Sequence, residues 1–238
     1  MHAYYKENAG KLRKQMNRYL CLIRGDIERI FAKPYEEALE EIWKFYEERL
    51  MEKFPYIGGD SVSGTKNLTD AYFFVALGET ASPYGLSLED WGKLTTVCME
   101  RYLDKTPKPA RKAAGFLFGR ERLMRKMLEK KDRKNQENAL KNPGSFETKV
   151  QEPTEEYPVH FHTLRCPLND FAEANGYRKY MPYLCNLDYV MFGKMGVSLY
   201  REKTCAAGDG CCDFKFKKSA PIPSYWPPHI LDENDPLK

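Results

Sequence analysis

The chain has 238 residues, of which 42% are hydrophobic and 30% are charged, a balance typical of a folded globular protein and not of a disordered one. Its net charge of +4 is too small to indicate a nucleic-acid partner, and no apolar run approaches the roughly 20 residues that span a membrane. The first residues lack the apolar core of a signal peptide, so we expect a cytoplasmic protein whose cysteines stay reduced.

The N-terminal part is predicted to be helical. Residues 34–54 place apolar side chains three and four positions apart with charges on the other face, which predicts an amphipathic helix. A weaker pattern of the same kind covers residues 5–31. The segment 69–80 is nearly all apolar, which predicts a helix at the centre of a bundle.

Two further helices are predicted before the chain changes character. Ser87 followed by Asp90 has the spacing of a capping box, which marks the start of one helix. Residues 110–141 are predicted to form a single long helix, whose part from 120 to 141 carries nine Lys or Arg against four Asp or Glu. A solvated basic face is the simple interpretation, and a site that attracts an anion or a partner is the alternative.

The C-terminal part mixes the two periodicities. Residues 158–166 alternate as in a strand, helical spacing follows over 166–176 and 177–196, and alternation returns in 197–204 and 212–218. This order predicts an α+β fold in which a helical N-terminal part precedes a small antiparallel-sheet domain with ββααββ order.

The composition along the chain predicts four parts. These are a helical region at 1–141, a seam at 142–157, an α+β thiol-rich domain at 158–218 and an extended Pro-rich tail at 219–238. The apolar helix and the tail each have a use in a homo-oligomer and an explanation in a monomer, so the sequence leaves the oligomeric state open.

The cysteines gather in the thiol-rich domain, where five of the seven lie with the spacing C-x18-C-x19-C-x5-C-C. No C-x2-C pair is present, which argues against a structural zinc ribbon. The candidate ligands for a soft metal are Cys185, Cys205, Cys211, Cys212 and His160. The simplest interpretation of each thiol is that it is a small buried side chain.

Residues 201–216, REKTCAAGDGCCDFKF, are predicted to turn between two strands of a hairpin. The run Ala-Ala-Gly-Asp-Gly has turn chemistry, because glycine takes positive φ without strain. Phe214 and Phe216 alternate with lysines on the returning strand. The hairpin does not account for the three thiols at its ends.

Asp188 is the most unusual polar residue of the domain, because it lies in an otherwise apolar helical run. It follows Cys185 by three positions, so the two side chains share a helix face. A lone acid in such surroundings is paired, neutral or functional, and the sequence leaves the paired and the functional interpretations equal. On strand 158–166, His160 and His162 share one face.

Three segments resemble the L-2-amino-thiazoline-4-carboxylic acid hydrolase family. They are FHTLRCPLNDFAEANG, YMPYLCNLDYVMFG and LYREKTCAAGDGCCDFKF, and together with the region around FPYIGGD the resemblance covers most of residues 50–217. The last segment is also similar to the end of 4-vinyl reductase domains, which are small-molecule or metal-sensing modules. Cys205 and Cys211 are not part of the family pattern.

The resemblance implies a hydrolase that opens a cyclic amidine–thioether, converting L-2-amino-thiazoline-4-carboxylate to N-carbamoyl-L-cysteine, without a required cofactor. In the mechanism that we expect, a thiolate attacks the carbon between nitrogen and sulfur, or a carboxylate activates water there. The expected catalytic residues are Cys185, Asp188 and Cys166, and the expected substrate-binding residues are Arg201, Arg165, His162 and Cys212. The alternatives are a thiol-rich module that binds or senses a small molecule, metal or organometal, and a scaffold whose thiols only pack.

Overall fold

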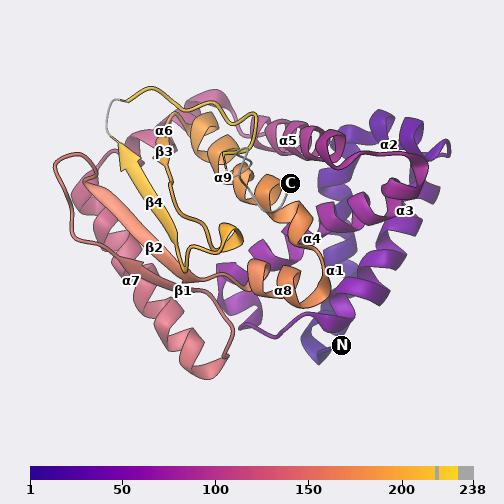
Figure 1. The fold of residues 1–238 in the computed structure, drawn as a ribbon, viewed down its shortest axis with the longest axis horizontal. Helices are drawn as coiled ribbons and strands as arrows, with labels where there is room; N and C mark the ends of the chain where they lie inside the picture. The colour runs from indigo at the N-terminus through magenta and orange to yellow at the C-terminus, as the bar shows by residue number, and fades with distance from the viewer. Residues whose placement is uncertain (218–219, 230–238) are drawn as a thin grey trace. The chain divides into compact units, whose positions relative to one another are not determined.

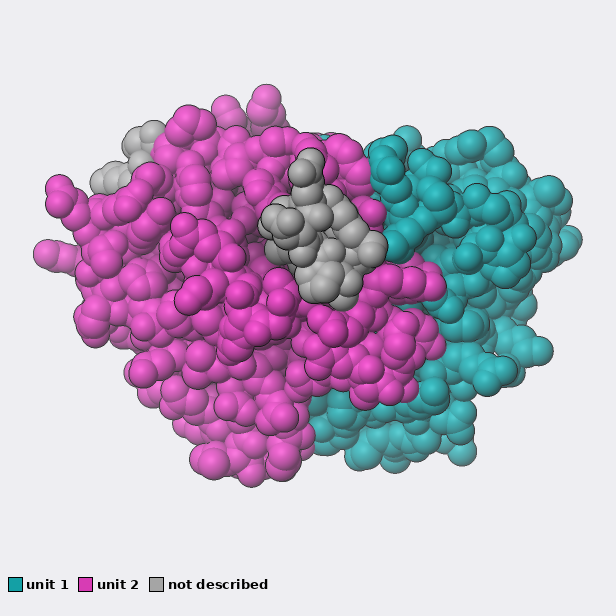
Figure 2. Space-filling view, viewed as in Figure 1, with its two compact units in different colours: residues 1–102 teal, residues 103–238 magenta. Residues whose placement is uncertain are grey.

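The structure is a computed structural model that describes residues 1–217 and 220–229. The chain divides into two compact units, residues 1–102 and 103–238, which are coloured separately in Figure 2. This division falls at 102/103, whereas the sequence suggested a seam at 142–157. The difference arises because the long helices after residue 107 pack on the sheet that follows them.

The first unit is helical, as predicted for the N-terminal part. Its α-helices, with short 3-10 and π turns between them, are α1 (Ala3–Leu20), α2 (Arg24–Phe31), α3 (Tyr35–Phe45), α4 (Ser63–Ala81) and the greater part of α5 (Leu88–Asp104). The predicted central helix is confirmed, because every side chain of α4 from Tyr72 to Leu77 is buried. The predicted capping box is confirmed too, since Ser87 Oγ accepts the backbone N–H of Asp90 at 3.1 Å.

The second unit begins with two helices where the sequence predicted one. Helix α6 (Lys108–Phe118) ends at Gly119, Arg120 leaves the helical conformation, and α7 (Glu121–Lys141) begins there. Phe118 and Met124 both contact the same core. Residues six positions apart lie about 240° apart around a continuous helix, so the break is what lets both side chains face the sheet.

A four-stranded antiparallel sheet follows among the described residues (Figure 1). Its strands are β1 (Glu147–Val150), β2 (Val159–Arg165), β3 (Ser198–Tyr200) and β4 (Cys212–Lys217), in the order β1-β2-β4-β3. Helices α8 (Pro167–Asn175) and α9 (Met181–Met195) lie between β2 and β3 in the chain. The predicted α+β class and ββααββ order are therefore confirmed, with β1 inside the stretch that the sequence assigned to the seam.

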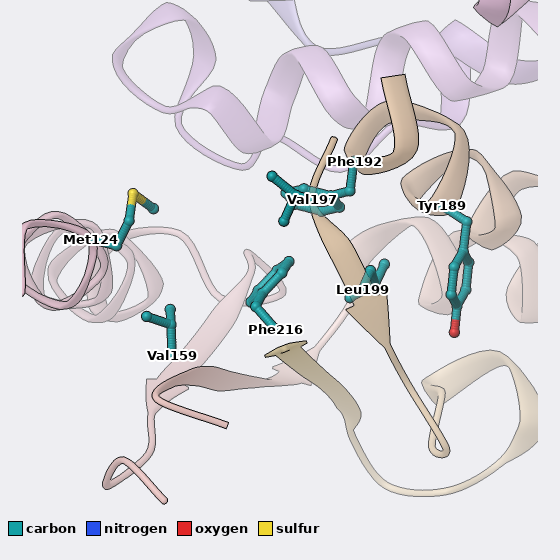
Figure 3. Close-up of a cluster of buried hydrophobic side chains, with 7 residues drawn as sticks. All are labelled: Met124, Val159, Tyr189, Phe192, Val197, Leu199 and Phe216. Carbon is teal, nitrogen blue, oxygen red and sulfur yellow. The ribbon is translucent and has the colours of Figure 1, made fainter. Parts of the chain in front are cut away.

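One face of this sheet forms the core of the second unit (Figure 3). In the register of β2 with β4, Phe161 lies opposite Phe214 and Thr163 lies opposite Cys212, so these side chains share that face. Helices α7 and α9 supply the other layer. The buried cluster consists of Met124, Val159, Tyr189, Phe192, Val197, Leu199 and Phe216.

Close backbone contact brings α6 against the end of α9. A Cβ atom on Gly115 would lie 2.0 Å from the carbonyl oxygen of Met195, which no real side chain tolerates. Glycine at this position therefore allows α6 to reach α9, and α9 carries two of the candidate site residues. We expect any larger residue at 115 to displace α9.

The predicted hairpin is present, although its connection is longer than a tight turn. Leu199 pairs with Phe216 across β3 and β4, and residues 201–211 connect the strands through a short 3-10 turn. Gly208 and Gly210 have φ of 89° and 59°, which confirms the use of glycine in this turn.

The described part of the predicted tail, residues 220–229, has neither helix nor strand. Ser198 Oγ lies 2.6 Å from the carbonyl oxygen of Ala220, which ties the segment to β3. Residue 219 and residues 230–238 lie outside the described residues. Within the described ranges, no helix combines the length and the apolar character needed to cross a membrane.

Candidate functional site

The centre of the candidate site is an ion pair between α9 and the loop after β3. Arg201 Nη1 lies 2.8 Å from Asp188 Oδ2, and Arg201 Nη2 donates to the backbone carbonyl of Cys185 at 2.8 Å. The guanidinium carbon lies 5.0 Å from the ring centroid of Phe214 and 5.4 Å from that of Tyr189. The unusual acid of the apolar run is therefore paired, and its partner is a buried arginine.

The two members of this pair differ in their access to solvent. The Arg201 side chain is 2% exposed, whereas that of Asp188 is 34% exposed. Burial raises the pKa of Asp188 above its ordinary value, although Arg201 opposes that shift. Arg201 contacts Asp188 and the Cys185 carbonyl through its two Nη atoms, so its planar fork orients protein groups, and Asp188 is the more exposed member of the pair.

Cys185 on α9 and Cys166 just before α8 bring two thiols to this pair. Burial raises the pKa of the Cys185 thiol well above its ordinary value, and the nearby Arg201 opposes the shift. Cys166 immediately precedes α8. Burial raises its pKa to about 12, while the backbone N–H groups of Asn169 and Leu168 favour its thiolate. Both thiols are protonated at neutral pH, so each needs a base to react.

Cys212 is the exception among the buried thiols. Its pKa is lowered by the hydrogen bond from the Cys205 thiol, against the effect of burial. The backbone N–H of Cys205 also donates to the Cys212 sulfur at 3.2 Å. Sequence reasoning grouped Cys212 with the substrate-binding residues but gave no sign of its lowered pKa, which depends on how the loop folds.

A cavity of about 410 Å³ opens beside these thiols. Its walls include Glu147, Leu164, Arg165, Cys166, Asn169, Asp170, Glu173, Cys205, Gly208 and Gly210. The Arg165 side chain lies 3.0 Å from Asp170 and 3.5 Å from Glu147. Three carboxylates and one guanidinium line the cavity, and the third carboxylate, Glu173, pairs with Arg178 at 3.7 Å. The walls therefore carry more negative than positive charge, which favours a ligand that carries positive charge.

Asn169 is a cavity residue that the sequence analysis did not single out. It is 5% exposed, and its Oδ1 atom has no hydrogen-bond partner in the part of the chain that the structure describes. A buried acceptor without a partner costs roughly 1–3 kcal/mol. Asn169 lies three residues after Cys166, in the first turn of α8, and this spacing could have indicated that it lies near the thiol.

The histidines of β2 do not join this cluster. His162 pairs with Asp213 and His160 pairs with Lys215 across β2 and β4, so both histidines lie on the face opposite Cys212. Burial lowers the pKa of His162, with Asp213 opposing the shift. The expectation that His162 and the thiols contact one substrate is therefore corrected, because the sheet lies between them.

The candidate soft-metal ligands are not brought together as a metal site. Cys205 and Cys212 are in contact, but His160 lies on the other face of the sheet. Among residues 1–217 and 220–229, no group of three or more His, Cys, Asp or Glu side chains is arranged to hold a metal ion.

Comparison with known proteins identifies the family of the chain. The family model for L-2-amino-thiazoline-4-carboxylic acid hydrolase matches residues 66–216, which is more than half of the chain. The chain therefore belongs to this family. Searches of curated proteins and of solved structures gave no significant match.

Proposed function

We propose that the protein hydrolyses a small cyclic amidine that contains a ring C–S bond, such as L-2-amino-thiazoline-4-carboxylate. The observation that carries the proposal is the contact of Arg201 with Asp188 and Cys185, beside a cavity lined by Cys166. These residues all lie within the segment that matches the hydrolase family. The product in that case is N-carbamoyl-L-cysteine.

The reaction adds one water molecule to the ring. The water oxygen bonds to the carbon between nitrogen and sulfur, and the bond from that carbon to sulfur breaks. The ring sulfur leaves as a thiolate and takes a proton. The carbon keeps both nitrogens and becomes the carbonyl of a urea, so every atom of substrate and water is in the product.

Asp188 is the general base of the proposed mechanism. Its carboxylate is partly exposed, and its raised pKa makes it a stronger base than an ordinary aspartate. It either deprotonates water directly or takes the proton of Cys185, whose thiolate then attacks the same carbon. In the second route, water releases the product from Cys185. Arg201 acts as a positioning residue, since it fixes Asp188 and the Cys185 carbonyl.

The cavity offers contacts for both ends of the substrate. Arg165 lines it and is the proposed partner of the substrate carboxylate, in exchange for its present contacts with Asp170 and Glu147. Asn169 has a free acceptor, which suits an N–H of the amidine. Rotation about the soft terminal torsion of Asn169 turns its amide oxygen toward the ligand.

The test uses the change in thiol content, because the substrate has no thiol and the product has one. The purified protein is incubated with L-2-amino-thiazoline-4-carboxylate, released thiol is titrated, and the product mass is checked for the gain of one water. We expect Asp188→Asn to lower the rate by about 10²–10⁴-fold, the range for loss of a general base. Release of no thiol by the unmodified protein refutes the proposed substrate.

The pH profile tests the role of Asp188 separately. A base must be ionised to act, so we expect kcat/KM to rise with pH through the pKa of Asp188, which lies above the ordinary 3.8. Glu202→Gln is the matched control, because the Glu202 side chain is 78% exposed and contacts Lys215. This variant keeps the profile, and a profile that is unchanged in Asp188→Asn contradicts the assignment.

A further inference from the structure

Cys205 and Cys212 form a pair of thiols that the proposed hydrolysis does not use. The sulfur of Cys212 accepts the Cys205 backbone N–H at 3.2 Å. The Cys205 sulfur also lies 3.6 Å from the carbonyl oxygen of Thr163 on β2. Both cysteines are free thiols, and the 3.2 Å contact of the Cys205 backbone nitrogen with the Cys212 sulfur places the two residues side by side.

The loop that carries Cys205 is held in place by side chains that bond to its backbone. Asp213 Oδ1 accepts the N–H groups of Glu202 at 2.9 Å and Lys203 at 2.6 Å. The Asp209 carboxylate accepts the N–H of Thr204 at 2.9 Å, immediately before Cys205. These bonds fix the position of Cys205 relative to Cys212 before any reaction.

The two thiols differ in access and in reactivity. Cys205 lines the 410 Å³ cavity, whereas Cys212 is 6% exposed and is not a lining residue. Hydrogen bonding from Cys205 lowers the pKa of Cys212. A reactive sulfur next to a second thiol is the arrangement that converts a first oxidation into a disulfide.

We propose that Cys205 and Cys212 are an oxidisable pair, which a small peroxide entering through the cavity converts to a disulfide. The Cys212 thiolate attacks one oxygen of hydrogen peroxide, the O–O bond breaks, and hydroxide leaves, so Cys212 becomes a sulfenic acid. The Cys205 sulfur then attacks the Cys212 sulfur, and the S–O bond breaks. The Cys205 proton and the hydroxyl leave as water. Two thiols are oxidised and one peroxide is reduced, and the step does not depend on the proposed hydrolysis.

The oxidation is tested on the full chain by peptide mapping. Fully reduced protein is treated with equimolar hydrogen peroxide, remaining thiols are alkylated, and the protein is cleaved with trypsin. Cys205, Cys211 and Cys212 fall in one peptide, residues 204–215. We expect this peptide to carry one alkyl group, on Cys211, and to be two hydrogens lighter at the other two cysteines. An alkyl group on Cys205 or Cys212, or on all three, overturns the proposal.

Two variants distinguish the Cys205–Cys212 pair from the neighbouring thiol of Cys211. Cys205→Ser removes the second thiol, so we expect no disulfide and a Cys212 sulfenic acid that dimedone traps. Cys211→Ser is the matched control, and we expect it to form the Cys205–Cys212 disulfide as the unmodified protein does. Loss of the disulfide in Cys211→Ser contradicts the proposal. So does a dimedone adduct of Cys212 that is equally abundant with and without Cys205.

Thiol release from the cyclic amidine is measured on the same preparations. A protein that forms the disulfide but does not hydrolyse the amidine contradicts only the proposed function. A protein that hydrolyses the amidine but forms no disulfide contradicts only the oxidisable pair.

Discussion

The two faces of the sheet carry opposite chemistry, although their residues alternate along the same strand. On β4 the core face carries Cys212, Phe214 and Phe216, and the other face carries Asp213, Lys215 and Lys217. The ion pairs of Lys217 and Arg201 also differ between the two faces. Lys217 Nζ lies 2.6 Å from Glu156 and its side chain is 35% exposed, whereas Arg201 on the core side is 2% exposed.

The difference between exposed and buried ion pairs indicates which face of the sheet carries the function. Exposed ion pairs cost little to form and contribute little to stability. A buried pair such as Arg201 with Asp188 carries a desolvation penalty that its attraction repays only in part, and apolar residues of similar volume often do as well. Stability alone therefore gives a weak reason for an ion pair among the thiols, and chemistry at Asp188 gives a stronger one.

The largest effect is expected on turnover, when a thiol inside the ion-pair cluster is compared with a thiol outside it. Cys185→Ala abolishes turnover if Cys185 is the nucleophile, while the free energy of unfolding changes by no more than about 1 kcal/mol, as for a small substitution. Cys211→Ala is the matched control, since Cys211 lies outside the ion-pair cluster, and its turnover should be unchanged. Thiol release and denaturant unfolding measure the two effects. Full turnover in Cys185→Ala removes Cys185 from the mechanism and leaves direct attack by water.

Removing one partner of each ion pair should separate the faces in stability. Arg201→Met leaves the Asp188 carboxylate without its partner, and we expect a loss of about 3 kcal/mol, at the lower end for a buried pair because Asp188 is partly exposed. Lys217→Met on the other face should change the free energy of unfolding by no more than about 0.5 kcal/mol. Urea unfolding at neutral pH measures both. Equal losses in the two variants would mean that burial of the pair has no energetic consequence.

A smaller effect is expected at the cavity wall. Asn169→Leu removes the acceptor that we assign to the amidine, and loss of one hydrogen bond to a charged group raises KM by about tenfold while kcat stays similar. Asn175→Ala is the control on the same helix, because Asn175 donates to the Phe171 carbonyl and does not line the cavity. Steady-state kinetics of both variants gives the comparison. Equal KM values for Asn169→Leu and the unmodified protein exclude the contact.

Periodicity predicted the parts of the fold in which burial repeats along the chain. The apolar run of α4 predicted a central helix, and alternation around residues 201–216 predicted a hairpin, because each pattern records which side chains avoid water. The break at Gly119 was missed, because helical spacing continues on both sides of it and only the packing of Phe118 and Met124 requires the turn.

The sequence predicted individual residues of the candidate site, but it did not predict which of them contact one another. The sequence singled out Asp188 as an acid in apolar surroundings, yet its partner Arg201 lies 13 positions later on a loop, where no repeat relates the two. Alternation placed His160 and His162 on one face of β2. It did not say that helices α7 and α9 cover the opposite face, because that depends on contacts between distant segments.

The smallest effect is expected at His162, on the face without the thiols. His162→Gln should leave turnover unchanged, since the sheet separates this side chain from Cys212. Its effect should appear in stability against pH. The pKa of His162 is lower in the folded chain than the ordinary 6.5, so the unfolded chain takes up a proton first as the pH falls. The contribution of His162 to stability is thus complete above pH 6.5 and is lost as the pH falls through the folded pKa. Glutamine does not titrate, so unfolding midpoints measured from pH 7.5 downward should decline less steeply in the variant. A steeper decline in the variant would contradict the lowered pKa, and a loss of turnover would mean that His162 faces the site after all.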